Sequence, residues 1–235
     1  MRVAIMQPYF FPYIGYFQLI YATDRFILLD DVQYIRHGWI NRNRILKPGE
    51  GVQYITVPLA AHHRETLIKD IGISDAPGCF LKILRQLEHY RKRAPYYKAV
   101  MELLRECFNC NATGITALNA HCLETVCRYI GLRYHIEIAG QLHLDYTAVQ
   151  EADEWALQIS RQLGASEYIN PPGGSSFFNR AKYEANNIQL WFLHPHLRAY
   201  DQGRQKFEPG LSIIDVMMFN TPEQIRSLLQ EYELT

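Results

Sequence analysis

The stretch that decides the fold is MRVAIMQPYFFPYIGYFQLIYATDRFILLDD, residues 1–31. Residues 2–6 are rich in β-forming apolar side chains, which predicts a buried first strand. The proline-containing segment PYFFPYIG, residues 8–15, breaks this pattern, and helical spacing follows over residues 16–23. An apolar run then predicts a second strand over residues 25–35. A strand, a helix and a second strand make a βαβ unit, which implies a parallel pair with a right-handed crossover.

The rest of the chain continues this alternation of strand and helix patterns. We expect further strands at 52–60, 133–142, 166–170 and 188–196. We expect helices at 80–95, 96–108, 114–131 and 148–163, with one or two closing helices over 211–234. A polar loop is expected at 36–51, and a short strand or connector at 68–75. The sum predicts a single α/β domain over 1–235, with a mostly parallel Rossmann-like sheet flanked by helices and a possible helical subdomain around 79–131.

Composition excludes several classes of function. The 235 residues suffice for a sizeable core, and 48% are hydrophobic, 20% charged, with a formal net charge of zero. This balance gives no electrostatic reason to expect nucleic acid or an anionic membrane as a partner. The chain begins without a signal-peptide pattern, and no window approaches the ~20 apolar residues of a membrane span. We therefore expect a cytoplasmic protein.

The cysteines and a histidine pair are interpreted as structural. Five cysteines are an odd number, and they fall among apolar helical positions, which is typical of reduced, buried thiols. Cys107 and Cys110 form one isolated CxxC, for which packing is favoured over zinc or redox chemistry. His194 and His196 lack a third ligand with diagnostic spacing. We expect no metal site.

The segment QPYFFPYIGYF, residues 7–17, carries more aromatic surface than a turn normally does. In a parallel sheet, the turn after the first strand lies at the carboxyl end, where ligands bind. One reading places the phenylalanines in the core and the tyrosines in solvent, and the other makes the turn a wall of a binding site. Prolines would stiffen it, and a glycine would allow close approach of a ligand. The binding candidates here are Gln7, Tyr9, Tyr13, Gly15 and Tyr16.

The next motif, DDVQYIRHGWINRNRI at residues 30–45, follows the second predicted strand. It supplies carboxylates, amides, guanidinium groups and an indole, which suit acid–base chemistry, anion binding and sugar or base stacking. A solvated loop would explain its polar residues but not its aromatic ones. If the strand persists, at most one of the two aspartates faces the site. The candidates are Asp30, Asp31 and His37 as catalytic groups, with Gln33, Trp39, Asn41, Arg42 and Asn43 as binding groups.

Two later segments add further candidates. The turn in YINPPGGSSFF, residues 168–178, could cradle an anion through backbone N–H groups, which makes Gly173, Gly174 and Ser175 candidates. The segment YDQGRQKFEPGLSIID, residues 200–215, places polar groups ahead of an apolar helix. Its candidates are Tyr200, Gln202, Ser212 and Asp215. Ser212 is equally readable as the N-cap of that helix.

An analogy at the level of the fold concerns Tyr13-Ile14-Gly15-Tyr16. This tetrad occupies the place at which class I nucleotidyltransferases carry an H-x-G-H motif that contacts nucleotide phosphates. Tyrosines can donate hydrogen bonds to phosphate but carry no positive charge near neutral pH. A shared fold would therefore imply weakened or absent phosphate-transfer catalysis of that kind.

Four separated motifs together resemble the WbqC-like protein family over nearly the whole chain: MQPYFFPYIGYFQLI, DDVQYIRHGWINRNRI, HYRKRAPYY and YDQGRQKFEPGLSIIDVMMFN. Members of that family are often encoded among bacterial surface-polysaccharide and O-antigen genes, and some are described as glycine or aminoacyl transferases acting on sugars. The resemblance implies functional roles for residues of three motifs: Gln7, Pro8, Tyr9, Pro12, Gly15, Tyr16; Asp30, Asp31, Gln33, Trp39, Asn41, Arg42; and Tyr200, Gln202, Phe207, Ser212, Asp215. The family tends to have a Ser-Gly-rich stretch near Tyr168, where this chain has two prolines that change the geometry of the turn.

Three functions follow as hypotheses. The first is a transferase that attaches an acyl or aminoacyl group to an amino sugar carried as a nucleotide sugar, with Asp30, Asp31 or His37 as base and Asn41 or Arg42 stabilising the oxyanion. The second is an ATP-dependent activating enzyme, in which the paired aspartates would hold Mg²⁺. The third is a non-catalytic protein that binds nucleotide sugars. The motifs contain no cysteine, which disfavours a covalent thiol mechanism.

Overall fold

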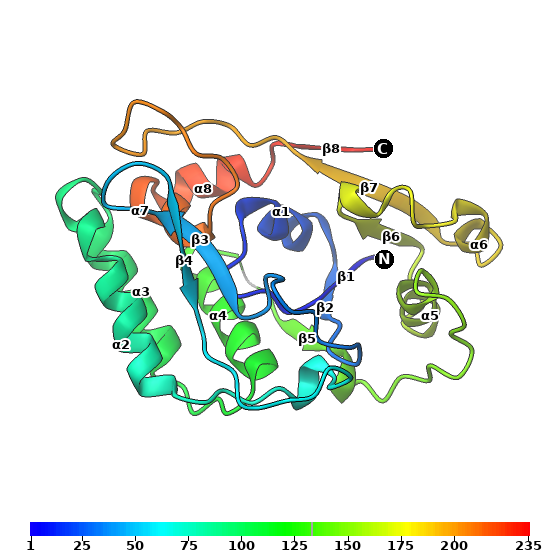
Figure 1. Ribbon diagram of the computed structural model, residues 1–235. Helices are drawn as coiled ribbons and strands as arrows, with labels where there is room; N and C mark the ends of the chain where they lie inside the picture. The colour runs from blue at the N-terminus through cyan, green and yellow to red at the C-terminus, as the bar shows by residue number, and fades with distance from the viewer. Residues whose placement is uncertain (133) are drawn as a thin grey trace.

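A computed structural model describes residues 1–132 and 134–235. Its central sheet has six strands in the order β5–β2–β1–β6–β7–β8 (Figure 1). All neighbouring pairs are parallel except β7 with β8. The strands are β1 (Arg2–Met6), β2 (Arg25–Leu28), β5 (Ile136–Ile138), β6 (Glu167–Asn170), β7 (Gln189–Pro195) and β8 (Tyr232–Leu234). The prediction of a mostly parallel α/β sheet, including its first βαβ unit, is confirmed.

Helices flank this sheet (Figure 1). They are α1 (Ile14–Ala22), α2 (Ala76–Gln86), α3 (Tyr97–Phe108), α4 (Ile115–Tyr129), α5 (Glu154–Gln162), α6 (Arg180–Glu184), α7 (Ile213–Phe219) and α8 (Pro222–Leu228). Short 3-10 turns are η1 (Ile68–Asp70), η2 (Glu88–Lys92), η3 (Ala139–Gln141) and η4 (Pro172–Gly174). The helices α2, α3 and α4 pack against one another at one end of the molecule, in the region where the sequence predicts a helical segment.

Alternation along each strand divides the core between the two faces of the sheet. Ala4 and Phe26 belong to the larger cluster, which also contains the buried face of α1. Val3 and Ile27 belong to the smaller cluster, which α5 and α6 cover. Both faces are therefore closed, as a mostly parallel sheet requires.

The strand order places a switch between β1 and β6. From β1 the chain builds β2 and β5 on one side, and it later builds β6, β7 and β8 on the other. Counted along the chain, the order is 3-2-1-4-5-6, which is the order of doubly wound dinucleotide-binding sheets. The Rossmann-like assignment stays a prediction that this order supports. Ligands of such sheets bind at the carboxyl ends of the strands beside the switch.

Several predicted boundaries are wrong. The second strand ends at Leu28, well short of residue 35. The loop expected at 36–51 contains β3 (Arg42–Leu46), which pairs antiparallel with β4 (Val52–Thr56) as a separate hairpin. Charged side chains on the outer face of β3 conceal its alternation, because Asn43 and Ile45 point inward while Arg42 and Arg44 do not.

Other differences lie in the second half of the chain. The helix expected at 148–163 begins only at Glu154, and the short helix α6 was not expected. The closing segment forms two helices, separated by the capping box of Thr221 and Gln224, and ends in β8 rather than in a helix. Residues 68–70 form a 3-10 turn. Arg133, the first residue of the strand expected at 133–142, lies outside the described residues.

The described part of the chain bears on two further expectations. It contains no helix that is long and apolar enough to cross a membrane. All five cysteines are free thiols, and all but the half-buried Cys110 are buried. Burial raises the pKa of Cys122, whose thiol also lies beside that of Cys107.

Candidate functional site

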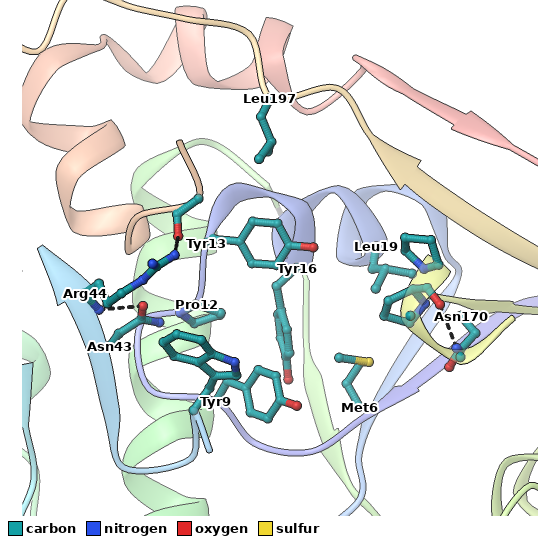
Figure 2. A pocket seen from close by; sticks show the side chains of 16 residues that line it. Met6, Tyr9, Pro12, Tyr13, Tyr16, Leu19, Asn43, Arg44, Asn170 and Leu197 are labelled. Atoms are coloured by element: carbon teal, nitrogen blue, oxygen red, sulfur yellow. Dashed lines mark hydrogen bonds between the residues drawn. The ribbon is translucent and has the colours of Figure 1, made fainter. Parts of the chain in front are cut away.

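A cavity of about 500 Å³ lies at the carboxyl ends of β1 and β6, beside the switch point (Figure 2). Its wall is formed by the aromatic turn after β1, the first turns of α1, the hairpin strand β3, the loop after β6 and two residues from the 196–210 segment. The lining residues are Met6, Tyr9, Pro12, Tyr13, Tyr16, Leu19, Trp39, Asn43, Arg44, Asn170, Pro171, Pro172, Gly173, Gly174, Leu197 and Gly210.

The aromatic residues of the turn divide by chemistry. Phe10, Phe11 and Phe17 are buried in the core, whereas Tyr9, Tyr13 and Tyr16 line the cavity. In Figure 2 the hydroxyls of Tyr9 and Tyr13 point into the space between the turn and Asn170. Burial raises the pKa of both phenols, so both are protonated hydrogen-bond donors at neutral pH. The turn therefore packs the core with one set of rings and walls the cavity with the other.

Side-chain donors from distant segments hold this turn in an uncommon conformation. Phe11 has a φ of 39°, in the left-handed region that a bulky residue rarely adopts. Its carbonyl accepts hydrogen bonds from Asn43 Nδ2 at 2.9 Å and Ser212 Oγ at 2.7 Å. Asn119 Nδ2, from α4, donates to the carbonyl of Pro8 at 2.8 Å. The shape of the cavity floor is thus fixed by buried amides and a hydroxyl.

Gly15 sets the position of Tyr13. A Cβ atom at Gly15 would lie 2.5 Å from the Tyr13 ring, which is closer than carbon atoms can approach. The missing side chain lets the ring lie over the first turn of α1, where it lines the cavity. Gly15 does not itself line the cavity, but it allows the Tyr13 ring to do so.

Arg44 is the charged residue of the cavity wall. Its Nη2 donates to the carbonyl of Gly210 at 3.3 Å, and its guanidinium lies 5.5 Å from the centre of the Trp39 ring. The Nε atom is buried without a hydrogen-bond partner among the described residues. Within the same residues, no carboxylate lies within ion-pair distance of Arg44. The cavity is therefore aromatic with a single unneutralised positive charge.

The loop after β6 closes the opposite wall. Asn170 accepts a hydrogen bond from the Tyr168 hydroxyl at 2.8 Å and donates to the carbonyl of Pro171 at 2.8 Å. A Cβ at Gly174 would lie 2.3 Å from Asn170 Nδ2 and 2.8 Å from the Phe178 ring, so a glycine is needed for this close approach. The Pro-Pro-Gly-Gly turn brings its backbone to the cavity edge. Ser175 does not line the cavity.

The structure brings together seven of the predicted site residues at this cavity: Tyr9, Tyr13, Tyr16, Trp39, Asn43, Gly173 and Gly174. Others lie nearby or elsewhere. Gln7 offers its carbonyl to the Tyr16 hydroxyl at 2.8 Å but does not line the cavity.

The predicted catalytic aspartates do not line the cavity. Asp30 is buried and accepts a hydrogen bond from the Gly140 N–H at 3.0 Å, and Asp31 forms an ion pair with Lys69 at 2.6 Å. Burial raises the pKa of Asp30, and the neighbouring Asp31 charge adds to this, while the hydrogen bond from Gly140 opposes it. Both carboxylates are engaged within the protein.

The polar residues of the segment 200–215 form a buried network. Asp215 accepts hydrogen bonds from Tyr90 at 2.6 Å, Tyr200 at 2.7 Å and Gln202 at 2.8 Å. Ser212 donates to the aromatic turn and also accepts from the Ile214 N–H, so its reading as an N-cap is confirmed. These four predicted residues lie behind the cavity rather than on its surface.

The remaining candidates lie in two other pockets. Gln33 belongs to one of them, and His37, Asn41 and Arg42 belong to an adjoining one. Asn41 accepts a hydrogen bond from the Tyr34 hydroxyl at 3.0 Å. The motif at 30–45 is therefore divided between two surfaces, with Trp39 and Asn43 on the cavity side.

Sequence reasoning missed Arg44, Asn119 and Leu197. Arg44 could have been found, because it directly follows the candidate Asn43 in the same basic motif and is another arginine of that motif. Asn119 sits in an apolar helix pattern, where a polar residue with no local role is a signal of a buried contact. Leu197 carries no such signal, because its place at the cavity depends on the course of the chain after β7.

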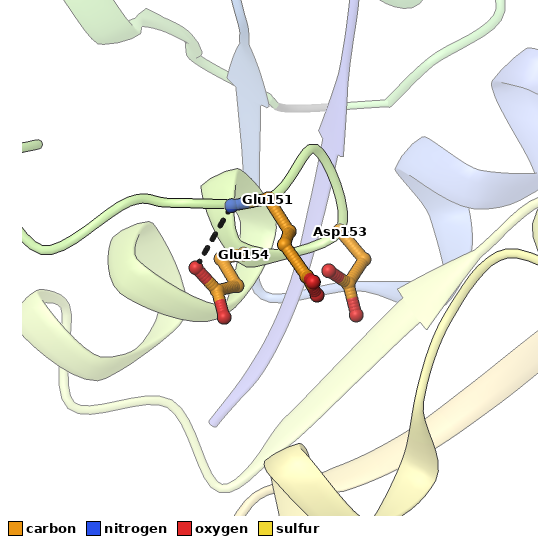
Figure 3. A group of neighbouring side chains, drawn as sticks. All are labelled: Glu151, Asp153 and Glu154. Carbon is orange, nitrogen blue, oxygen red and sulfur yellow. Dashed lines mark hydrogen bonds between the residues drawn. The ribbon is translucent and has the colours of Figure 1, made fainter.

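A cluster of carboxylates outside the cavity comprises Glu151, Asp153 and Glu154 (Figure 3). The ammonium group of Lys182 already lies among them, at 3.2 Å from Asp153 and 2.9 Å from Glu154. One lysine thus offsets part of the charge of the cluster, and the ion pairs join α6 to the start of α5.

Comparison with known proteins relates this cavity to a protein family. A model of the WbqC-like protein family matches residues 7–227, which contain the aromatic turn and every wall of the cavity except Met6. The chain belongs to the WbqC-like protein family. It is also 31% identical over 227 residues to the uncharacterized protein Rv1507c of Mycobacterium tuberculosis (strain ATCC 25618 / H37Rv), a match that covers 93% of each chain. No solved structure matches. The WbqC-like resemblance predicted from four motifs is therefore confirmed.

Proposed function

We propose that this WbqC-like protein acts in bacterial surface-polysaccharide biosynthesis, where it binds a nucleotide-linked amino sugar in the aromatic cavity and attaches an acyl or aminoacyl group, such as glycyl, to the sugar amine. The observation that carries the proposal is the cavity itself, which lies beside the switch point and combines aromatic walls with one unneutralised arginine. Membership of the WbqC-like protein family also supports the proposal. The proposed location is the cytoplasm, where thiols stay reduced.

The walls suit the two halves of such a ligand. The rings of Tyr9, Tyr13 and Trp39 offer apolar faces for the C–H surface of a sugar or for a base, with hydroxyls that donate to its oxygens. The Arg44 guanidinium presents a planar fork for a phosphate or carboxylate. A neutral sugar would leave that charge unused, whereas a phosphorylated sugar would neutralise it.

The chemistry proposed for the cavity depends on positioning rather than on a side-chain base. None of its lining residues is an aspartate, glutamate, histidine or cysteine. An attacking amine would therefore enter in its neutral form and form a C–N bond to the acyl carbon of an activated donor. The bond from that carbon to the donor's leaving group would break, and the amine proton would pass to solvent. Protonated Tyr9 and Tyr13, together with Arg44, would donate to the oxyanion that develops on the acyl carbon.

The lack of a base in the lining favours a second candidate, a protein that binds nucleotide sugars without catalysis. The two candidates share the same ligand and differ in turnover. A mass-spectrometric assay of sugar acylation with an activated acyl donor separates them. Product formation that is lost in Tyr13→Phe supports the transferase, whereas tight binding with no product from any donor supports the binding protein.

Calorimetric titration with a panel of nucleotide sugars tests the shared step. We expect one nucleotide sugar to bind, with affinity about tenfold weaker in Arg44→Gln because one charge-assisted contact is lost. Arg161→Gln removes the same charge at an exposed position away from the cavity and is the matched control. The absence of binding by every nucleotide sugar would refute the proposal. Binding of Mg²⁺-ATP alone, lost in Tyr16→Ala, would favour the ATP-dependent alternative.

A further inference from the structure

Two adjoining pockets form a second hollow, which we call the basic groove. They have volumes of about 580 Å³ and 320 Å³ and share Tyr34, Arg36 and His62. None of their lining residues belongs to the aromatic cavity. The groove follows the connection after β2 and the segment 62–64 that faces it. It is therefore a surface feature separate from the cavity.

The charged groups that line this groove are all basic. Its lining contains three arginines and three histidines and no aspartate or glutamate: Arg36, Arg42, Arg64, His37, His62 and His63. The chain as a whole has a formal net charge of zero, so this concentration of one sign is local. Such a surface attracts anions.

The arginines of the groove lack acidic partners. Among residues 1–132 and 134–235, no carboxylate lies within ion-pair distance of Arg36, Arg42 or Arg64. Arg42 is held in place, because its Nε donates to the carbonyl of Gly38 at 3.2 Å and its guanidinium lies 4.6 Å from the centre of the Tyr54 ring. One fixed guanidinium and two exposed ones thus face a common hollow.

His62 adds a half-buried ring to the wall that the two pockets share. Its Nδ1 lies 2.8 Å from the carbonyl of Ala60, and because a carbonyl can only accept, this nitrogen carries a proton. Its Nε2 is buried and has no hydrogen-bond partner among the described residues. The ring packs edge-on against Tyr34, with centroids 5.1 Å apart, so it cannot turn freely to find one. Buried polar atoms without partners are uncommon in folded proteins.

The positive charges of two arginines also affect the ionisation of a tyrosine that lines the groove. Burial raises the pKa of Tyr34, and the positive charges of Arg42 and Arg36 oppose this rise. Both guanidinium groups therefore act on the phenol that lies between the two pockets.

We propose that the basic groove is a second ligand site that binds a di- or triphosphate group. Three guanidinium forks exceed what a single carboxylate needs, and they match the several oxygens and charges of a phosphate chain. The same phosphate chemistry occurs in nucleoside polyphosphates and in inorganic polyphosphate.

The test is calorimetric titration with inorganic tripolyphosphate and, separately, with ATP in the absence of divalent cations. We expect tripolyphosphate to bind, and its affinity to fall about tenfold for each of Arg36→Gln and Arg64→Gln, since each removes one charge-assisted contact. Both arginines are exposed, so these variants are expected to fold normally. Arg91→Gln, an exposed arginine on η2, is the matched control and should bind as the wild type does.

The outcomes separate the ligand sources and the two proposed sites. Tighter binding of ATP than of tripolyphosphate assigns the groove to a nucleotide, and equal binding assigns it to the phosphate chain alone. Binding should weaken as salt rises, because the groove is open to solvent. Tyr13→Ala, in the aromatic cavity, should leave tripolyphosphate binding unchanged, so either site can fail without the other. If the wild type does not bind tripolyphosphate, or if a variant that combines Arg36→Gln with Arg64→Gln binds it as Arg91→Gln does, the proposal is wrong.

Discussion

At the scale of single residues, small changes decide which side chains the cavity presents. Gly15 is required by the Tyr13 ring above it, and Gly174 by the close approach of Asn170. The tyrosines were predictable as residues of a cavity wall because they crowd a turn at the carboxyl end of a strand. The burial of Asp215 was not predictable, because one of its hydrogen-bond donors, Tyr90, is 125 residues away in the sequence.

Gly15→Ala should separate binding from stability. The new methyl group would displace the Tyr13 ring from the cavity wall, while alanine favours the helix by up to about 1 kcal/mol over glycine. We expect weaker nucleotide-sugar binding in calorimetry with little loss of thermal stability. Gly49→Ala is the control, because a Cβ there meets no atom within 4 Å. Unchanged affinity in Gly15→Ala would show that the position of Tyr13 does not matter for the ligand.

Asp30 gives a prediction about pH. Its pKa is raised in the folded state, so the folded protein binds this proton more tightly than the unfolded chain does. Stability is therefore lost as pH rises from the unfolded to the folded pKa. Asp30→Asn cannot ionise and keeps an acceptor for the Gly140 N–H. Its melting temperature should therefore increase relative to that of the wild type as pH is raised from 4 to 7.

The control for this pH series is Glu184→Gln, which changes an exposed carboxylate that has no side-chain partner in the described structure. Its melting curve should follow that of the wild type across the series. A difference between Asp30→Asn and the wild type that stays constant with pH would contradict the raised pKa. Loss of sugar acylation in Asp30→Asn with full stability would instead restore this aspartate to the proposed reaction.

At the scale of elements, the sequence predicts the apolar, buried strands but does not predict the polar strand β3 or the short strand β8. The parallel strands β1 and β2 are buried on both faces, so their apolar runs are unmistakable. The hairpin strand β3 has arginines on one face, and this pattern is typical of a loop as well. The strand β8 follows a helical pattern directly, and it pairs with β7 only because the fold brings the chain end there.

The hydrogen bonds around Asp215 should stabilise the packing of three elements against one another. The Tyr90 hydroxyl donates to Asp215 and accepts from the Leu46 N–H, so it connects η2, α7 and β3. Tyr90→Phe leaves a buried N–H and a buried carboxylate short of partners, and we expect a loss of about 1–3 kcal/mol in the free energy of unfolding by urea denaturation. Tyr21→Phe, at an exposed position on α1, should cost nothing measurable. An equal cost for both variants would exclude a special role for the network.

At the scale of the whole molecule, the position of the cavity was easier to predict than its walls. The order of predicted strands and helices implied a sheet whose carboxyl ends carry the site, and the cavity lies there. The motif at 30–45 was expected to serve one site, but its residues are divided between the aromatic cavity and the basic groove. This division depends on how the connection to β3 is folded, which the sequence of a segment expected to be a loop does not show.

The anchoring of the aromatic turn makes ligand binding a late event in folding. Hydrogen bonds from Asn43, Asn119 and Ser212 hold the carbonyls of Pro8, Phe10 and Phe11, and the longest of these contacts joins residues 201 apart in the sequence. Contacts this distant in sequence form slowly, because the entropy of loop closure must be overcome first. In stopped-flow refolding, we expect the capacity to bind a nucleotide sugar to appear no earlier than the slowest phase of tyrosine and tryptophan fluorescence. A nascent chain that has not yet reached Ser212 would contain the sequence of its first strand and helix but would lack the hydrogen bond that completes the cavity floor. It would therefore be unable to bind the sugar before its synthesis ends.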